Sequence, residues 1–309
     1  MQRVPQEQAA PLTSSSSIDP RILHLERLRA RIAAGEPMTG DLASSFALAA
    51  TAIDPTATED TLGRLGGNGG VTLYRSLVGW AALVPRERVL DIGCGSGGAT
   101  REAARAVGAE GSVIGIDASP EAIAIARERT PDELGITYRV LRAEHLAGIP
   151  DRSIDCVIAS LVFEQLVDLG AVAQEIVRVL RPGGRIVASV MDFDQLRPAD
   201  AAVFGSVLAV VGWHARGALS GRASRATIPR DPRDLTALRG AGLAGVEERD
   251  VQLIAVLDTE EDAWDLFSRS LIGQALDPLG RLDLRGALAR HVPHTLYLPM
   301  RFLRTRRPG

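Results

Sequence analysis

A tight glycine loop directly after a short apolar strand constrains the fold of this chain more than any other feature. Residues 89–98 read Val-Leu-Asp-Ile-Gly-Cys-Gly-Ser-Gly-Gly, and a helical pattern begins near Ala99. A strand, a glycine loop and a helix in this order are typical of an open α/β sheet that binds a nucleotide-like ligand at the carboxyl end of its first strand. Gly93, Gly95 and Gly97 are spaced more closely than in the Gly-x-Gly-x-x-Gly loops that hold a pyrophosphate. Because glycine has no Cβ, this backbone can pass close to a ligand.

A second short apolar strand ends in a carboxylate at Asp117. This residue lies 26 positions after Asp91, near the ~20 residues expected between a nucleotide-binding loop and its ribose-binding acid. An ionised carboxylate only accepts hydrogen bonds, so it can take both ribose hydroxyl protons. The alternative is that Asp117 caps the helix that begins at Pro120. Ser119 is the better cap because it directly precedes that proline, so ribose binding is favoured.

Two further patterns predict the next strands. Residues 153–166 contain an apolar strand that ends at the small polar residue Ser160. Residues 180–184, Leu-Arg-Pro-Gly-Gly, stop a helix and turn the chain, because proline cannot continue a helix and glycine accepts the turn. Residues 185–190 are then apolar enough for a buried strand.

Together these patterns resemble the class I S-adenosylmethionine-dependent methyltransferases, most closely those that act on quinones and natural products. The resemblance covers about residues 70–200, and the C-terminal third more weakly. It implies a Rossmann-like, seven-stranded, mostly parallel sheet with helices on both faces, a helical N-terminal cap, and helical insertions that form a substrate lid. It also implies S-adenosylmethionine as cofactor and S-adenosylhomocysteine as product. The residues implied to bind the cofactor are Asp91, Gly93, Cys94, Gly95, Gly97, Asp117, Ala118, Ala143, Glu144 and Ser160.

One residue departs from the family pattern. Where many members have Gly-Asp-Ala-Glu, residues 141–144 read Leu-Arg-Ala-Glu. The guanidinium of Arg142 has donors only and cannot accept from the adenine amino group. Three alternatives stay open: Glu144 accepts instead, the backbone around Ala143 recognises adenine, or adenine recognition is altered.

Alternating strands and helices along the chain indicate a parallel sheet. We expect a disordered tail at 1–18, a helical cap at 19–84 and a methyltransferase domain at 85–309. Lid insertions are expected at about 192–230 and 258–294. The expected strands lie near 88–92, 112–116, 137–141, 154–159, 185–190, 245–256 and 296–303, with cap helices at 22–33, 41–53 and 71–83 and a flexible break at 66–70.

Composition narrows the chemistry and the partners. All 35 basic residues are arginine, which excludes Schiff-base chemistry and a P-loop lysine. The net charge of −3 argues against binding to nucleic acid or an anionic membrane. The cysteines, Cys94 and Cys156, are expected to be buried and reduced, and the histidine spacing predicts no metal site. With no signal peptide or transmembrane run, we expect a cytoplasmic protein with a small-molecule substrate, and a homodimer stays open.

The catalytic residue is harder to identify, because methyl transfer depends mainly on alignment of the two reactants. His214 is our candidate for a general base, since its pKa suits proton transfer and Trp213 precedes it in the expected lid. Asp192 and Glu164 are the other candidates. The leading hypothesis is a small-molecule methyltransferase. The alternatives are a cofactor-binding enzyme that transfers no methyl group, such as a cyclase or decarboxylase, and an inactive partner subunit. In the cap, Asn68 and Tyr74 are interpreted as a linker residue and a core tyrosine rather than as cofactor contacts.

Overall fold

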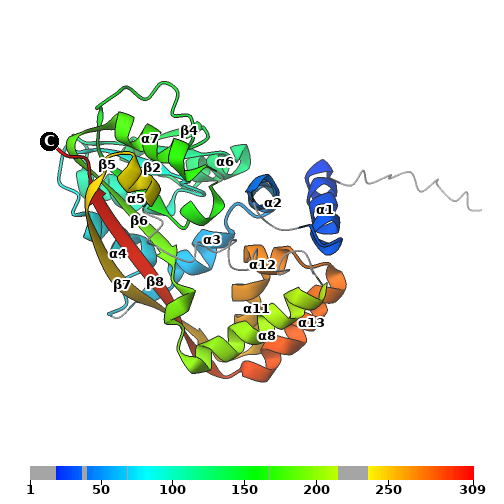
Figure 1. Cartoon of the computed structure of the whole chain (residues 1–309). Helices are drawn as coiled ribbons and strands as arrows, with labels where there is room; N and C mark the ends of the chain where they lie inside the picture. Colours follow the sequence, from blue (N-terminus) through cyan, green and yellow to red (C-terminus); the bar gives the residue numbers. More distant parts are fainter. Residues whose placement is uncertain (1–18, 37–39, 68, 167, 215–235) are drawn as a thin grey trace, which may run out of the picture.

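The computed structural model describes residues 19–36, 40–67, 69–166, 168–214 and 236–309 of the chain. Its strands are β1 (Gly66–Gly67), β2 (Arg88–Ile92), β3 (Ser112–Asp117), β4 (Thr137–Val140), β5 (Ile154–Ser160), β6 (Leu180–Met191), β7 (Ala244–Leu257) and β8 (His294–Arg306). They form one sheet in the order β1-β7-β8-β6-β5-β2-β3-β4 (Figure 1). The strands from β2 to β6 are parallel, whereas β8 runs antiparallel to both β6 and β7.

The predicted Rossmann-like fold is confirmed, and the predicted number of strands is wrong by one. Residues 66–70 were expected to be a flexible break, but Gly66–Gly67 pairs with Leu253 and Ile254 of β7. A Cβ at Gly67 would lie 3.1 Å from the carbonyl oxygen of Gln252. The missing side chains therefore allow the close approach that adds an eighth strand.

Helices cover both faces of the sheet. On one face lie α4 (Leu73–Ala81) and α5 (Gly98–Val107), with α6 (Pro120–Glu128) beside β3 and β4. On the other face lie α7 (Leu169–Val179) and α10 (Thr236–Gly240). Along β2, Val89 is buried on the α5 side and Leu90 on the α7 side. A strand buried on both faces has to be apolar throughout, which explains the short hydrophobic runs in the sequence.

Three helices precede α4 and form the N-terminal region. They are α1 (Pro20–Ala33), α2 (Gly40–Ile53) and α3 (Ala57–Asp60), followed by the short turn η1 (Leu62–Arg64). The Asp19 side chain accepts a hydrogen bond from the Arg21 backbone and so caps α1. The helices predicted at 22–33, 41–53 and 71–83 are confirmed. The expected disordered tail and Asn68 lie outside the described residues.

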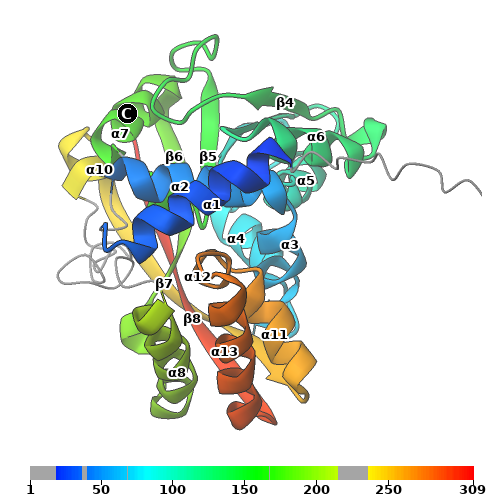
Figure 2. The same ribbon diagram turned by 90° about the vertical axis from the view of Figure 1, so that its right-hand side faces the viewer.

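Four helices form a helical lobe: α8 (Pro198–His214), α11 (Glu260–Ser268), α12 (Leu271–Gln274) and α13 (Pro278–Leu288). Figure 1 shows this lobe at the far end of β7 and β8. Figure 2 shows α1 and α2 lying across the molecule between the parallel strands and the lobe. The insertion expected at 192–230 is described only as far as His214, and its remainder lies outside the described residues.

The lobe is carried by a long hairpin. The pairing of β8 with β6 ends at Met300 and Met191, whereas its pairing with β7 continues to His294 and Leu257. The hairpin therefore extends past the carboxyl end of β6, the same end at which the glycine loop follows β2. In the described part of the chain, no helix is both long enough and apolar enough to cross a membrane.

Candidate functional site

The glycine loop after β2 depends on left-handed backbone conformations. The φ angles of Gly93, Gly95 and Gly97 are +66°, +53° and +89°, in the region where other residues are strained. A Cβ at Gly93 would lie 2.4 Å from the Val162 side chain, so the turn after β5 packs directly over the loop. The loop thus joins the carboxyl ends of β2 and β5.

Asp117 lies at the end of β3 and holds the glycine loop. Its carboxylate accepts hydrogen bonds from the backbone N–H groups of Gly95 and Ser119, both at 2.9 Å. Burial raises the pKa of Asp117, while these hydrogen bonds oppose the rise. Ser119 caps α6 by accepting from the Ala122 N–H, as predicted. The carboxylate is therefore ordered beside the loop, where a ribose is expected.

Asp91 is buried beneath the loop, with 1% of its surface exposed. The Thr100 hydroxyl donates to its Oδ2 at 2.6 Å. Its Oδ1 is buried and has no hydrogen-bond partner among the described residues. Burial raises the pKa of Asp91 to about 7, and the neighbouring charge of Asp117 adds to the rise. An incompletely bonded buried carboxyl of this kind is suited to meet a cationic ligand.

A cavity of about 100 Å³ opens above these strand ends. Among the predicted cofactor residues, Gly93, Asp117, Ala118, Ala143 and Glu144 line it. The structure therefore brings residues from three separate segments to one place. Val162, Gln165 and Leu166 complete this side of the cavity, after β5.

The other predicted cofactor residues do not line this cavity. Asp91, Gly95 and Gly97 belong to the loop and its supporting strand, whereas the Cys94 side chain is buried beside Tyr138 in a small cluster with α6. The Ser160 hydroxyl lies 3.0 Å from the Ser189 hydroxyl, between β5 and β6. A role for these residues in cofactor binding stays a prediction.

Helix α2 forms the opposite wall, which sequence reasoning did not identify. Its Ser44, Ala47, Leu48 and Thr51 line the cavity. Residues at i, i+3, i+4 and i+7 share one helix face, so the spacing contained a signal. The mixture of hydroxyls and small apolar groups on this face resembles an ordinary core helix, which is why the signal was missed.

Arg142 and Glu144 also line the cavity. The Arg142 guanidinium lies 3.4 Å from Glu144, and their side chains are 55% and 21% exposed. Glu144 is therefore the more enclosed of the two, and Arg142 lies toward solvent. Glu144 is thus an enclosed side-chain acceptor at this edge of the cavity, and the alternatives of recognition by the backbone around Ala143 and of altered adenine recognition stay open.

Glu59 of α3 is a second residue that sequence reasoning missed. Its carboxylate accepts from the Ser96 hydroxyl at 2.5 Å and pairs with Arg101, which also donates to the Ser96 carbonyl at 2.8 Å. The N-terminal region is thus tied to the glycine loop by charge. Glu59 and Ser96 are 37 positions apart, so no local pattern could reveal the contact.

Tyr74 packs its ring against backbone at the start of α5. A Cβ built at Gly98 would lie 2.4 Å from this ring, and one built at Gly63 would lie 2.5 Å from it. Burial raises the pKa of Tyr74. The ring also borders an open hollow of about 420 Å³ that contains Arg101 and Arg129. Tyr74 is absent from the lining of the cavity above the glycine loop, which agrees with the interpretation as a packed tyrosine.

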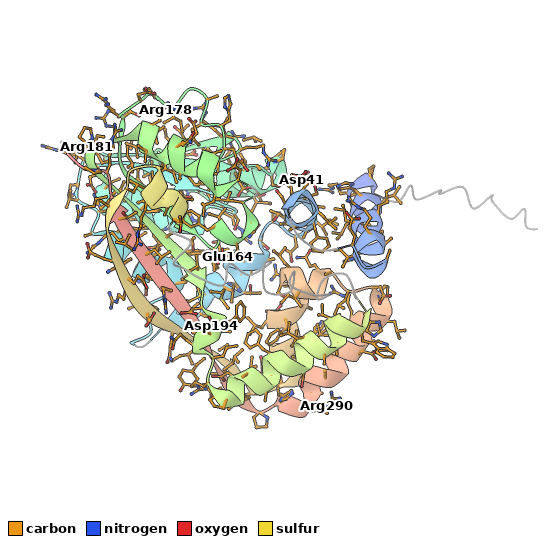
Figure 3. The ribbon with its side chains drawn as sticks, viewed as in Figure 1. Asp41, Glu164, Arg178, Arg181, Asp194 and Arg290 are labelled. Carbon is orange, nitrogen blue, oxygen red and sulfur yellow. The ribbon has the colours of Figure 1, made fainter. Side chains whose placement is uncertain are left out.

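Glu164 lies in the turn η3 (Phe163–Gln165), directly after β5. The Met191 N–H at the end of β6 donates to its Oε1 at 3.1 Å. Its Oε2 is buried without a hydrogen-bond partner in the described part of the chain. Burial raises the pKa of Glu164 to about 7. Figure 3 shows Glu164 on the side of the sheet that faces the helical lobe.

The other two candidate bases are engaged elsewhere. Nε2 of His214 lies 2.6 Å from Asp283, where α8 packs on α13, and Nδ1 lies 3.9 Å from Asp277. Asp192 pairs with Arg301 at 2.5 Å. These contacts give both residues a role in packing, and a catalytic role for His214 stays a prediction.

The central segment of the chain is similar to known proteins. Residues 90–188 match the family described as "Methyltransferase domain". The chain is 37% identical to a demethylmenaquinone methyltransferase of Tropheryma whipplei, over 33% of this chain and 40% of that protein. It is 38% identical to the aklanonic acid methyltransferase DauC of a Streptomyces species, over 41% of this chain and 58% of that protein.

The fold also matches solved structures. The crystal structure of the YcgJ protein from Bacillus subtilis superimposes with a TM-score of 0.52 at 18% identity, covering 76% of this chain and 98% of that one. The matched region covers only part of the relatives. It spans 28% of the length of an arsenite methyltransferase and 58% of the length of the aklanonic acid methyltransferase. The segment that matches the family, residues 90–188, contains the glycine loop.

Proposed function

We propose that this chain, whose residues 90–188 match the family described as "Methyltransferase domain", is a class I S-adenosylmethionine-dependent methyltransferase that acts on a small molecule. The observation that carries the proposal is the cavity that joins Gly93, Asp117 and Glu144 beneath α2. It lies at the carboxyl ends of parallel strands. The strand order reverses here, because β3 and β4 lie on one side of β2 in the sheet and β5 and β6 lie on the other. Open α/β sheets bind their ligands at such points.

The residues present fit the cofactor. Asp117 is proposed to accept from the ribose hydroxyls, and Glu144 to accept from the adenine amino group. The unpartnered oxygen of Asp91 suits the ammonium of the methionine portion, because an uncompensated buried carboxyl gains most from a cation. Bound S-adenosylmethionine supplies an electrophilic methyl group. The division into a cap at 19–84, a methyltransferase domain at 85–309 and lid insertions remains part of this proposal.

The protein's own contribution is mainly to align the reactants. Gly93, Gly95 and Gly97 allow the backbone to approach the cofactor, and α2 covers it and excludes water. Such positioning can supply about 7–11 kcal/mol of the barrier. Glu164 is the candidate base that lies next to the cavity lining, since Val162 and Gln165 on either side of it are lining residues.

The acceptor is proposed to be a small molecule in the cytoplasm. A net charge of −3 gives no attraction to nucleic acid. The quinone and polyketide methyltransferases among the relatives motivate a first substrate panel of hydroquinones and aromatic polyketides.

Calorimetric titration with S-adenosylmethionine and S-adenosylhomocysteine tests the cofactor, and product mass tests the reaction. We expect micromolar binding of both ligands, and a gain of one methylene unit in an acceptor with release of S-adenosylhomocysteine. Binding without any methylated product, but with a rearranged or decarboxylated one, would favour the non-methylating enzyme. No binding of either ligand would refute the proposal.

A further inference from the structure

The carboxyl edge of the sheet arranges its polar groups in a fixed order. Asp117 ends β3, the glycine loop follows β2, η3 follows β5, and Met191 ends β6. Since β3, β2, β5 and β6 are neighbours in the sheet, this order is also an order in space. A cofactor whose ribose is at Asp117 and whose amino-acid portion is on the glycine loop therefore exposes its remaining side toward β5 and β6.

Glu164 lies on that remaining side. The turn that contains it is pressed onto the glycine loop, because a Cβ at Gly93 would lie 2.4 Å from Val162. Gln165, the next residue, lines the cavity, and its side chain donates to the Leu161 carbonyl at 3.0 Å. Met191 fixes one carboxyl oxygen of Glu164 and leaves the other buried without a partner among the described residues.

The charged groups near Glu164 do not neutralise it. Asp192 follows β6 and is paired with Arg301. Asp41 belongs to α2, the helix that packs on η3, and is exposed to solvent. Asp91 and Asp117 beside the loop are themselves acidic. Buried carboxylates are normally paired with a cation or bound to a metal. The uncompensated carboxylate, directly behind the lining residues Val162 and Gln165, would therefore gain from a positive charge that a ligand supplies.

We infer that Glu164 is a specificity-determining residue that faces the reacting sulfur of the cofactor, where its carboxylate favours the cationic sulfonium over the neutral thioether. The inference rests on the proposed function. S-Adenosylmethionine and S-adenosylhomocysteine differ by one methyl group and one positive charge, both at this sulfur. A carboxylate beside the sulfur distinguishes the two ligands, whereas groups on the ribose or the amino acid hold both alike. Such a residue would favour exchange of product for fresh cofactor.

The test compares the affinities of the two ligands in wild-type protein and in Glu164→Gln, which keeps the shape and removes the charge. Calorimetry at pH 8 should show about a tenfold loss for S-adenosylmethionine, the size expected for one charge pair in a partly screened site. The loss for S-adenosylhomocysteine should be less than about twofold. Sinefungin, whose ammonium stands where the sulfonium methyl does, should follow S-adenosylmethionine. The matched control Asp117→Asn should weaken all three ligands by the same factor.

A second readout uses pH. In wild-type protein the preference for S-adenosylmethionine over S-adenosylhomocysteine should grow between pH 6 and pH 8, as Glu164 ionises, and in Glu164→Gln it should stay constant. An equal loss of both ligands in Glu164→Gln, or no loss of either, overturns the inference. Glu164→Ala serves as a second variant if the glutamine variant melts at a lower temperature. Failure of wild-type protein to bind any of the three ligands instead overturns the proposed function, so the two failures are distinguishable.

Discussion

Replacing Asp91 by Asn should stabilise the ligand-free protein, and the gain should increase with pH. Asp91 is 1% exposed, and burial raises its pKa from 3.8 to about 7. Above pH 3.8 the unfolded chain loses this proton while the folded protein keeps it until about pH 7. The carboxyl therefore lowers the free energy of unfolding increasingly across this window, and the cost reaches about 4 kcal/mol above pH 7.

Urea unfolding followed by circular dichroism measures this effect at pH 5 and pH 8. The pKa values above correspond to a cost of about 2 kcal/mol at pH 5 and about 4 kcal/mol at pH 8. Burial of the new amide has its own cost, but that cost is the same at both pH values. The gain from Asp91→Asn should therefore be larger at pH 8 by about 2–3 kcal/mol. Asp132→Asn, on an exposed turn, is the control and should change stability by less than about 0.5 kcal/mol at either pH.

The reasoning is refuted if the difference between Asp91→Asn and wild type does not change with pH, or if it becomes less favourable at pH 8. The same variant should bind S-adenosylmethionine more weakly, because it removes the carboxylate that is proposed to meet the ammonium. If Asp91→Asn is more stable than the wild type but binds S-adenosylmethionine with lower affinity, the buried carboxyl contributes to binding and lowers stability.

Three further changes test the site and its support. Asp117→Ala should weaken binding of both cofactor forms by about 1.5–3 kcal/mol in calorimetry, and an unchanged affinity with an intact fold would exclude the ribose role. Gly93→Ala should lower the melting temperature and the affinity for the cofactor, because its Cβ would meet Val162 at 2.4 Å in a left-handed conformation. Adding Val162→Ala to this variant should restore part of both. No recovery would mean that backbone strain at φ +66° dominates. Arg185→Met should lower the free energy of unfolding in urea by about 3–5 kcal/mol. The change leaves Glu87 buried without the two 2.7 Å hydrogen bonds that it accepts from Arg185. A loss under about 1 kcal/mol would show that water replaces the guanidinium.

The parts of the fold that follow from local sequence patterns were predictable. The strand before the glycine loop, the cap at Ser119 and the end of α7 before Pro182 each depend on residues within a few positions of one another. The turn expected at 180–184 was wrong, because β6 already begins at Leu180, which pairs with Ile154 of β5. The cavity wall on α2 and the Glu59 contact to Ser96 depend instead on segments that only the folded chain brings together. The contact between His214 and Asp283 was unpredictable for the same reason. The two residues are 69 positions apart, and no local sequence pattern links them. The strand β1 escaped prediction because a glycine pair has no side chains from which a pattern could arise.

The long β7–β8 hairpin separates the part of the chain that holds the cofactor from the part that is proposed to cover the acceptor. Everything between Leu257 and His294 leaves and re-enters the sheet at one hydrogen-bonded pair, beyond the last contact with β6. The backbone pairing of the inner strands therefore does not depend on this segment. Its side chains still contact the rest of the molecule, because Arg269 pairs with Asp54 and Asp60 and Asp283 bonds to His214. A designer who wants a new acceptor could graft a different helical insertion between Leu257 and His294, provided that the new helices keep the contacts to α2 and α8.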